Sequence, residues 1–483
     1  IMSFKMISKI TDKIIAIIQN LDENRQVETT LRKSCTIPEI LSDLDIAIPE
    51  RGISPEALTI TIDQLQDKSV KTNNALFMNQ MFGKQQSIGV LGDILAALLN
   101  TSMYTYEVAP ALTLIEKECI KRLGSFVWKS SETGDGIFTP GSSISNITAM
   151  TLARNATFPN SNKTGLFDNL RFSIFVSEHA HYSFVKGALF VGMGEQTIVK
   201  VKSDTNGKID IPSLNEAIEN EIQNGHVPLM LVGIAGTTIT GVYDDLYRLS
   251  EIAKEYNMWF HVDGAYGGSL LFSSKEKYKL NGIQYADSVS WSLHKIMGVP
   301  LVCAVLLTKN KGVLENSFAV SADYLFHDDT GLDLGQKSLQ CGRRADALKL
   351  WLAWKLEGDN GFEDRGDGLM NAANKFAEKI NGSEAFELLC LPETPIVCFR
   401  FICLELSPGN LNKLNKKIRE TIFNDGRILF NYSTYEGKIY LRCVISDPNM
   451  DETLMETILT EVTKVANQLL LTKHDLNINT QPV

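Results

Sequence analysis

Hydrophobic residues form short unbroken runs through the middle of the chain, and these runs alternate with segments in which they recur every three or four positions. The unbroken runs include F-S-I-F-V-S, V-P-L-M-L-V-G, M-W-F-H-V-D and L-V-C-A-V-L-L. Such runs, bounded by polar residues, are typical of buried strands. A helical period follows in A-L-T-L-I-E-K-E-C-I-K-R-L and in L-Y-R-L-S-E-I-A-K-E-Y-N. Between residues 111 and 310 this alternation predicts an α/β fold, with a mostly parallel sheet covered by helices.

The two ends of the chain follow different patterns. Residues 1–75 are polar and helical in period, and three prolines, at positions 38, 49 and 55, divide them into short helices. Because this segment offers little core of its own, we expect it to pack on another surface. From about residue 366 helices and strands follow in an order that indicates a small α+β domain. We therefore expect an N-terminal helical segment, a large domain and a small C-terminal domain, at 1–85, 86–365 and 366–483.

Composition narrows the classes of function. The chain of 483 residues has an ordinary globular composition, and its net charge of −10 argues against a nucleic-acid or anionic-membrane partner. Its eight cysteines form no C-x-x-C pair, which indicates reduced thiols rather than disulfides or a metal site. No cleavable signal is evident, and no apolar run reaches the roughly 18 residues of a membrane span. We expect a cytoplasmic protein that does not enter a membrane.

Two of the predicted strands end in residues that suit catalysis. The run W-F-H-V ends at Asp263, and S-V-S-W is followed, three positions on, by His294 and Lys295. Taken singly, an aspartate after a strand is more often a cap, and a lysine is more often a solvated surface charge. In open α/β sheets, however, ligands bind at strand ends. A carboxylate and an amine placed there suit pyridoxal phosphate, whose aldehyde condenses with the amine and whose protonated ring nitrogen pairs with the carboxylate.

The order of the motifs strengthens this hypothesis. H-V-D-G-A-Y-G-G, followed by D-S-V-S-W-S-L-H-K, resembles the H-V-D-A-A-W-G-G and D-S-V-x-W-N-P-H-K of group II pyridoxal-phosphate-dependent amino-acid decarboxylases. The resemblance is to the branch of glutamate and cysteine sulfinate (aspartate) decarboxylases, and it extends over roughly residues 75–470. It implies a fold-type-I architecture with pyridoxal 5'-phosphate as cofactor. It also implies a homodimer with active sites at the interface, in which residues 1–85 form a dimerisation segment.

The resemblance also assigns residues to the cofactor. T-P-G-S-S-I-S-N is similar to the family's phosphate loop, where amides at a helix start receive the phosphate. S-E-H-A-H-Y-S aligns His181 with the histidine that stacks on the ring, opposite the methyl group of Ala265. G-T-T places Thr238 near the cofactor, and Ser292 stands where the family has an asparagine that donates to phosphate. The cofactor contacts implied are Ser142, Ser143, His181, Thr238, Asp263, Ala265, Ser292, His294 and Lys295.

Four further residues resemble the family's substrate contacts. Arg442, in I-Y-L-R-C-V-I-S-D-P, corresponds to an arginine that clamps the substrate α-carboxylate. Gln80 lies in a segment similar to F-F-N-Q-L, which places it beside the substrate. Phe82 and Ser102 are the pair found in relatives that act on cysteine sulfinate and aspartate, where glutamate decarboxylases have serine and asparagine. The expected substrate is therefore a small acidic L-amino acid.

The segment 324–344 raises the question of the proton donor. In related decarboxylases this loop covers the site and carries a tyrosine that returns a proton to the substrate carbon. Here the loop is shorter and has no tyrosine after Tyr324, so His327 is the candidate donor, with water as the alternative. The catalytic residues expected are Lys295, His181, Asp263 and His327. Open alternatives are a glutamate decarboxylase, an aldehyde-forming oxidative deaminating enzyme on the same fold, and a non-catalytic binding relative.

Overall fold

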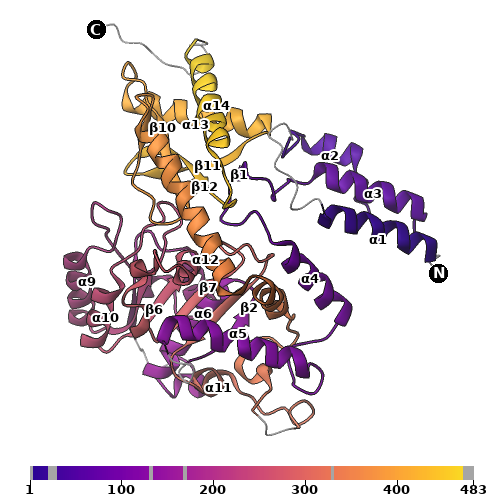
Figure 1. The fold of residues 1–483 in the computed structure, drawn as a ribbon. Coiled ribbons are helices and arrows are strands. Elements are labelled where there is room, and N and C mark those ends of the chain that lie inside the picture. The colour runs from indigo at the N-terminus through magenta and orange to yellow at the C-terminus, as the bar shows by residue number, and fades with distance from the viewer. Residues whose placement is uncertain (1–3, 20–29, 130–133, 167–170, 328–330, 472–483) are drawn as a thin grey trace. The chain divides into compact units, whose positions relative to one another are not determined.

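The computed structural model describes residues 4–19, 30–129, 134–166, 171–327 and 331–471 (Figure 1). Contacts divide the chain into two compact units. The large unit contains residues 88–370 and 392–395, and the second unit contains residues 1–87, 371–391 and 396–483. The second unit thus brings together the two ends of the chain. The division into 1–85, 86–365 and 366–483 that we drew from the sequence stays a prediction.

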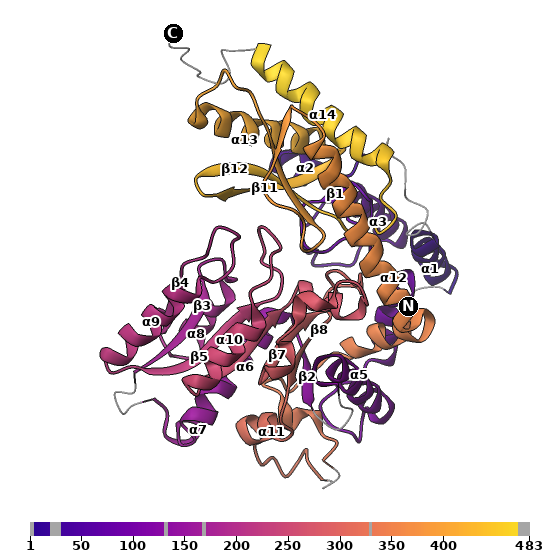
Figure 2. The same ribbon diagram turned by 60° about the vertical axis from the view of Figure 1, so that its left-hand side comes forward.

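Among its described residues, the large unit has a seven-stranded sheet in the order β2-β8-β7-β6-β5-β3-β4 (Figure 2). The strands from β4 to β7 pair in parallel, whereas β8 is antiparallel to both β7 and β2. The predicted α/β fold with a mostly parallel sheet is confirmed. The strand bounds are β2 (Asp135–Thr139), β3 (Phe172–Ser177), β4 (Ile198–Val201), β5 (Val227–Ile234), β6 (Trp259–Gly264), β7 (Ser288–Ser292) and β8 (Ala304–Thr308).

The unbroken hydrophobic runs form strands that are buried, because helices cover the sheet. Every residue of β3, β7 and β8 is buried. Helix α6 contacts β5 to β8, α10 contacts β5 and β6, and α5 contacts β2 and β8. The helices of this part of the chain are α4 (Ser87–Leu99), α5 (Pro110–Trp128), α6 (Ser142–Thr157), α7 (Ser161–Thr164), α8 (Ser183–Phe190), α9 (Ile211–Gln223), α10 (Leu246–Glu255), α11 (Val313–Phe318) and α12 (Asp346–Asn381).

Short 3-10 helices and one long helix complete the chain's middle. The predicted C-terminal helix near residue 369 is the second half of α12, whose helical backbone is interrupted at Gly358 with φ of 65°. That φ lies in the left-handed region, which glycine adopts without steric cost. The 3-10 helices are η1 (Glu195–Thr197), η2 (Gly267–Phe272), η3 (Lys277–Leu280), η4 (Ile283–Tyr285) and η5 (Leu334–Lys337).

In the part of the second unit that the structure describes, a five-stranded sheet has the order β1-β11-β12-β10-β9. Helices α13 (Pro408–Asp425) and α14 (Glu452–Leu471) pack on each other, and α13 also contacts β11 and β12. Strand β1 comes from the N-terminal segment and pairs in parallel with β11. The strand bounds are β1 (Phe77–Met78), β9 (Phe386–Leu388), β10 (Ile396–Phe401), β11 (Leu429–Tyr435) and β12 (Lys438–Val444).

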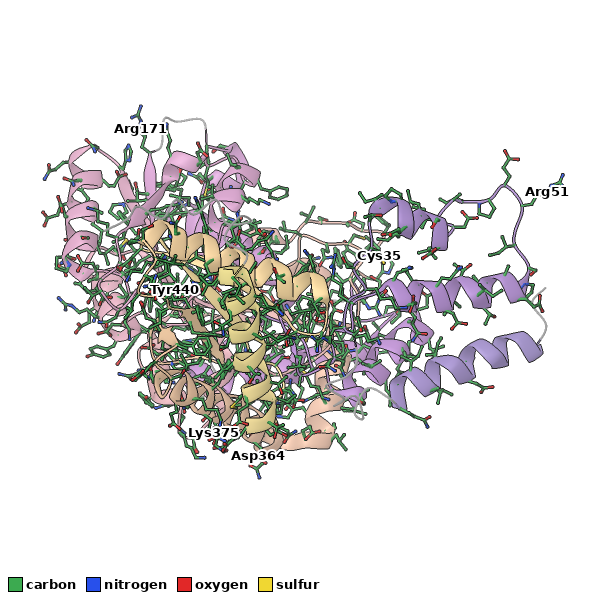
Figure 3. The ribbon with its side chains drawn as sticks, turned by 90° about the horizontal axis from the view of Figure 1, so that it is seen from above. Cys35, Arg51, Arg171, Asp364, Lys375 and Tyr440 are labelled. Atoms are coloured by element: carbon green, nitrogen blue, oxygen red, sulfur yellow. The ribbon has the colours of Figure 1, made fainter. Side chains whose placement is uncertain are left out.

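The N-terminal helices are α1 (Phe4–Gln19), α2 (Ile37–Asp43) and α3 (Pro55–Lys68). The prolines of α2 and α3 lie in the first turn, where Thr36 and Ser54 cap the helices, so these prolines begin helices rather than break them. Neither α2 nor α3 has a buried residue. Arg51 lies at the outer end of the connection between them (Figure 3). None of the helices formed by described residues is long and apolar enough to cross a membrane.

Candidate active site

Asp263 is a buried carboxylate that accepts three hydrogen bonds. Its Oδ1 accepts from the Ser290 hydroxyl and from the Ala265 amide, both at 3.1 Å, and its Oδ2 accepts from the Asn146 side-chain amide at 3.0 Å. Ser290 reaches it because β6 and β7 pair with Asp263 opposite Ser290. Asn146 comes from α6, which packs against these strands. The three donors compensate the burial of the carboxylate's negative charge.

The partners of Asp263 belong to a longer hydrogen-bonded chain. Asn146 donates to Asp263 through its amide group, so its carbonyl oxygen is left to accept from His261 Nε2, 3.1 Å away. The Nδ1 of His261 then accepts from the Ser288 hydroxyl at 2.8 Å. His261 is fully buried, and burial lowers its pKa to about 4. A neutral imidazole therefore stands behind the carboxylate and adds no charge of its own.

Sequence reasoning missed Asn146, Ser290 and His261 as parts of this arrangement. The signals lay in the quoted motifs, since Asn146 ends the I-S-N of the phosphate loop and His261 begins H-V-D. Their spacing along the chain did not show that they meet.

A second polar cluster lies at the start of α6. Gly141, with φ of 101°, precedes the helix, and its carbonyl accepts from the Ile144 amide at 2.9 Å. The amides of Ser142 and Ser143 precede this bond, so they have no acceptor within the helix. The Ser142 hydroxyl lies 2.6 Å from that of Ser292, at the end of β7. Hydroxyls and helix-start amides are the donors that a phosphate group needs.

His181 and Lys295 complete the arrangement. His181 is half-buried, and its Nδ1 accepts from the Ser183 amide at 3.2 Å. Burial lowers the pKa of His181, the Asp263 carboxylate raises it and the Lys295 amine lowers it, so Asp263 and Lys295 each lie within electrostatic range of His181. The backbone of Lys295 turns back after β7, where its amide donates to the Ser292 carbonyl at 3.3 Å. Ser292 therefore connects the cluster at the start of α6 to the turn that carries Lys295.

His294 is directed at the protein backbone. Its Nδ1 lies 2.8 Å from the carbonyl oxygen and 3.1 Å from the amide nitrogen of Cys303. Burial lowers the pKa of His294 to about 4, so the imidazole is neutral at pH 7. This contact supports the turn that precedes Lys295, and the expected contact of His294 with the cofactor stays a prediction.

A buried threonine next to the predicted Thr238 stabilises the G-T-T turn. Thr237 is buried and its hydroxyl lies 2.8 Å from that of Thr240, whereas the predicted Thr238 is exposed. Gly236 has φ of 91°, and a side chain there would meet the backbone nitrogen of Gly267 at 2.9 Å. The turn therefore needs glycine, and the role of Thr238 stays a prediction.

These residues fit pyridoxal phosphate. The donors of the α6 cluster match its phosphate, the Asp263 carboxylate matches a protonated ring nitrogen, and Lys295 supplies an amine within electrostatic range of His181. Among the described residues no group of three histidine, cysteine, aspartate or glutamate side chains is arranged to hold a metal ion.

The predicted substrate residues fall in both units. Arg442 is 5% exposed in β12, opposite Cys398 and Asn431 in the neighbouring strands. Gln80 is exposed, and the ring of Phe82 packs on that of Phe77 at 5.7 Å. These three belong to the second unit, so their contact with substrate stays a prediction.

Two predicted residues of the large unit contact its loops. The Ser102 hydroxyl accepts from the Arg343 amide at 3.2 Å. His327 has an exposed side chain, and its Nδ1 lies 3.6 Å from a carboxylate oxygen of Glu107. The contact described for His327 is with Glu107, so its role as proton donor stays a prediction. Residues 328–330, in the shortened part of the loop, lie outside the described residues.

Comparisons with known proteins agree with this geometry. Residues 38–402 match the pyridoxal-dependent decarboxylase conserved domain. Mouse CSAD (cysteine sulfinic acid decarboxylase) is 32% identical, with 94% of this chain and 98% of that chain covered and a TM-score of 0.89. The glutamate decarboxylase domain of a Vibrio parahaemolyticus diaminobutyrate-pyruvate transaminase and L-2,4-diaminobutyrate decarboxylase is 25% identical, with 96% of each covered and a TM-score of 0.85. Oryza sativa TDC with PLP and tryptamine shares the fold, at 20% identity over 96% and 97% of the chains and a TM-score of 0.88.

Proposed function

The chain belongs to the pyridoxal-dependent decarboxylase family, and we propose that it removes the α-carboxyl group of a small acidic L-amino acid, with cysteine sulfinate or aspartate preferred over glutamate. The expected family, enzyme class and cofactor, pyridoxal 5'-phosphate, are confirmed. The observation that carries the proposal is the buried Asp263 carboxylate with its three donors, together with His181, which lies within electrostatic range of both Asp263 and Lys295. The similarity to mouse CSAD supports the choice of substrate.

Each end of the cofactor is assigned to residues of this chain. Lys295 would hold the aldehyde end, Asp263 the ring nitrogen, and the cluster of Ser142, Ser143 and Ser292 the phosphate. His181 and Ala265 are assigned to the two faces of the ring. When bound, pyridoxal phosphate supplies a protonated ring that accepts the electrons left when carbon dioxide departs. Asp263 would favour the proton on the ring nitrogen, because a neighbouring negative charge raises the pKa of a cationic acid.

The remaining residues orient the substrate and exchange its proton. Arg442 and Gln80 are assigned to the α-carboxylate from the family resemblance, and a two-point contact through the guanidinium would direct the bond that breaks. Phe82 and Ser102 are assigned, from the same resemblance, to the selection of a short acidic side chain. The carbon that loses carbon dioxide must gain a proton, and His327 is the proposed donor.

A direct assay tests this function. Purified protein supplied with pyridoxal phosphate is given cysteine sulfinate, aspartate or glutamate, and amine, aldehyde, hydrogen peroxide and carbon dioxide are measured. We expect amine and carbon dioxide in equal amounts, and faster turnover of cysteine sulfinate or aspartate than of glutamate. Absence of carbon dioxide from all three substrates, in protein that binds the cofactor, would refute the proposal.

The same assay decides a second candidate activity. The exposed position of His327 favours an enzyme in which the substrate carbon is protonated slowly and oxygen intervenes. Aldehyde and peroxide would then replace amine as products. A mixture dominated by amine would reject this second activity.

A homodimer in the cytoplasm accompanies the proposal. The side chains of Ile37 in α2 and Ile60 in α3 are 74% and 58% exposed, and such apolar residues favour a covering surface. The eight free cysteines, four of them buried, support a reducing compartment. Light scattering of the purified protein should give twice the mass of 53.7 kDa. A monomer that keeps full activity would reject active sites at a dimer interface.

A further inference from the structure

A buried ion pair connects three segments around the proposed site. Arg343, near the end of the loop at 324–344, is 4% exposed, and Glu116, in α5, is fully buried. The Nη2 of Arg343 donates to Glu116 Oε1 at 2.6 Å. Neither residue was predicted from the sequence as part of the site.

The first segment is the end of β2. Phe138 donates its amide to Glu116 Oε1 at 3.1 Å, and its carbonyl accepts from Arg343 Nη2 at 3.2 Å. Strand β2 is at the edge of the seven-stranded sheet, so the outward backbone groups of Phe138 have no neighbouring strand. The side chains of Glu116 and Arg343 supply the hydrogen-bond partners that a neighbouring strand would otherwise provide. Gly141 follows Phe138 by three residues and α6 begins at the next residue, so the pair positions the strand end that leads into the phosphate cluster.

The second and third segments are the end of the loop and the segment that carries Ser102. Arg343 Nη1 donates to the Met103 carbonyl at 2.9 Å, and the Met103 amide donates to the Arg343 carbonyl at 2.9 Å. The Arg343 amide donates to the Ser102 hydroxyl at 3.2 Å. Through its side chain and backbone, Arg343 therefore joins the loop end, the proposed specificity position and β2.

Stability alone does not explain this pair. Among the described residues, Arg343 Nε and Glu116 Oε2 are buried and have no hydrogen-bond partner. A buried ion pair with unmet polar atoms is often no more stable than an apolar pair of similar volume. What an apolar pair could not do is hold both backbone groups of Phe138 and the carbonyl of Met103 at once.

We infer that Arg343 and Glu116 are positioning residues for the reaction, which hold the phosphate cluster and the end of the 324–344 loop in register with Ser102. The inference rests on the proposed function, because it assigns the phosphate of the cofactor to Ser142, Ser143 and Ser292. It predicts that cofactor affinity and the order of the loop depend on the pair beyond its effect on folding.

The test separates folding from positioning by a double substitution. Glu116→Gln and Arg343→Met each leave one charged partner buried alone, so each should lower the thermal unfolding midpoint. The double variant leaves no unpaired buried charge and should recover part of the lost midpoint. We expect its dissociation constant for pyridoxal phosphate to stay raised about tenfold to a hundredfold, the scale set by a small misplacement of binding groups. Chymotrypsin should also cut it faster at Phe326, a site that all variants share.

The control is a second ion pair that also includes a residue of α5. Arg122, in α5, pairs with Asp359 at the surface, and neither residue contacts β2 or the loop among the described contacts. The double variant Arg122→Met with Asp359→Asn should bind the cofactor and resist chymotrypsin as the wild type does. An equal loss in this control would overturn the assignment to Arg343 and Glu116.

The remaining outcomes are also decisive. A Glu116→Gln, Arg343→Met variant with a partly recovered midpoint, wild-type cofactor affinity and wild-type cleavage would overturn the inference. If that variant does not fold, Arg343→Lys takes its place, since one amine can keep the charge but cannot span Glu116, Phe138 and Met103; unchanged affinity and cleavage would again overturn it. Cofactor affinity and cleavage need no substrate, so a protein that binds cofactor without releasing carbon dioxide refutes the proposed function and leaves this result standing.

Discussion

Single residues set the charge of the proposed site. Asp263 is buried but accepts three hydrogen bonds, whereas burial lowers the pKa values of His261 and His294 to about 4. The two imidazoles are therefore neutral at pH 7, and they add no positive charge that would compete for the carboxylate. The Lys295 amine and the Asp263 carboxylate each lie within electrostatic range of His181. Two predictions belong to this scale.

Substitution of Lys295 removes the amine. Lys295→Ala should abolish turnover and the yellow absorption of the lysine-bound cofactor, while the phosphate cluster still binds pyridoxal phosphate. Absorption spectra and carbon dioxide release measure the two effects. Lys186→Ala, on α8, is the matched control and should behave as the wild type does. Normal turnover in Lys295→Ala would sink the assignment of the whole site.

Substitution of Asp263 tests the partner of the ring nitrogen. Asp263→Asn keeps the shape of the side chain but removes its charge, and losing a buried charged contact costs about 2–5 kcal/mol. The rate should fall by about thirtyfold to several-thousandfold, at ~1.4 kcal/mol for each factor of ten. Asp287→Asn is the control, because Asp287 is a half-buried carboxylate just before β7 that accepts from the Phe260 amide. A fall of less than about tenfold in kcat would count against Asp263 as that partner.

Whole elements decide which residues meet at the ends of strands. Strands β6 and β7 run in parallel, so Asp263 and the turn to Lys295 leave the sheet at its carboxyl end, where α6 also begins. Open α/β sheets bind ligands at the carboxyl ends of their strands. The loop at 324–344 contacts a different part of the chain. The ring of Phe326 lies against that of Tyr104, and His327 lies near Glu107. The proton donor is therefore a question about that loop.

Substitution in the loop tests the proton donor. If His327 returns the proton, His327→Phe should slow amine formation and raise the share of aldehyde, because the carbon stays unprotonated for longer. Chromatography of both products after a fixed number of turnovers measures the ratio. Tyr324→Phe, in the same loop, should leave the ratio at its wild-type value. An unchanged ratio in His327→Phe would leave water or Lys295 as the donor.

At the scale of the whole molecule, the proposed substrate preference and the folding stability can each be tested through residues from separate segments. The pair Phe82 and Ser102 comes from parts of the chain assigned to different units, and Ser102 is itself bonded to Arg343. The buried histidines come from β6 and from the turn after β7. Both properties can be tested without further structural information.

The substrate preference can be changed by two substitutions. Glutamate is one methylene longer than aspartate, and one methylene in a pocket is worth about 1–3 kcal/mol. We expect cysteine sulfinate or aspartate to be favoured over glutamate by about ten- to two-hundredfold in kcat/KM. Phe82→Ser combined with Ser102→Asn should erode or reverse this ratio. A wild-type preference for glutamate, or an unchanged ratio in the double variant, would contradict this interpretation of the pocket.

Folding stability should fall as the pH is lowered through the window set by the buried histidines. Burial lowers the pKa of His261 and of His294 from the usual 6.5 to about 4. Between these values the unfolded chain binds protons that the folded chain does not, so stability is complete above pH 6.5 and is lost progressively toward pH 4. Denaturant unfolding at pH 7.5 and 5 measures the difference. His294→Gln should reduce the difference, and an equal difference in that variant would assign the effect to other groups.

The sequence by itself determined the fold class, the cofactor and the family, because these depend on local pattern. Unbroken hydrophobic runs predict buried strands, and motifs such as H-V-D and H-K mark the ends of strands independently of the contacts that those strands make in the fold. The helix at Ser142 also followed from a local cue, since Gly141 can adopt the positive φ that begins it. These signals need no knowledge of distant contacts.

Only the tertiary structure decided which polar groups support the site. Asn146 and Asp263 are separated by 117 positions, and Arg343 and Glu116 by 227, yet each pair is hydrogen-bonded. Nothing in the local sequence of an asparagine or an arginine specifies a partner so far away. Register between strands and the packing of α5 and α6 on the sheet bring them together, because a buried polar group must find a partner inside the fold.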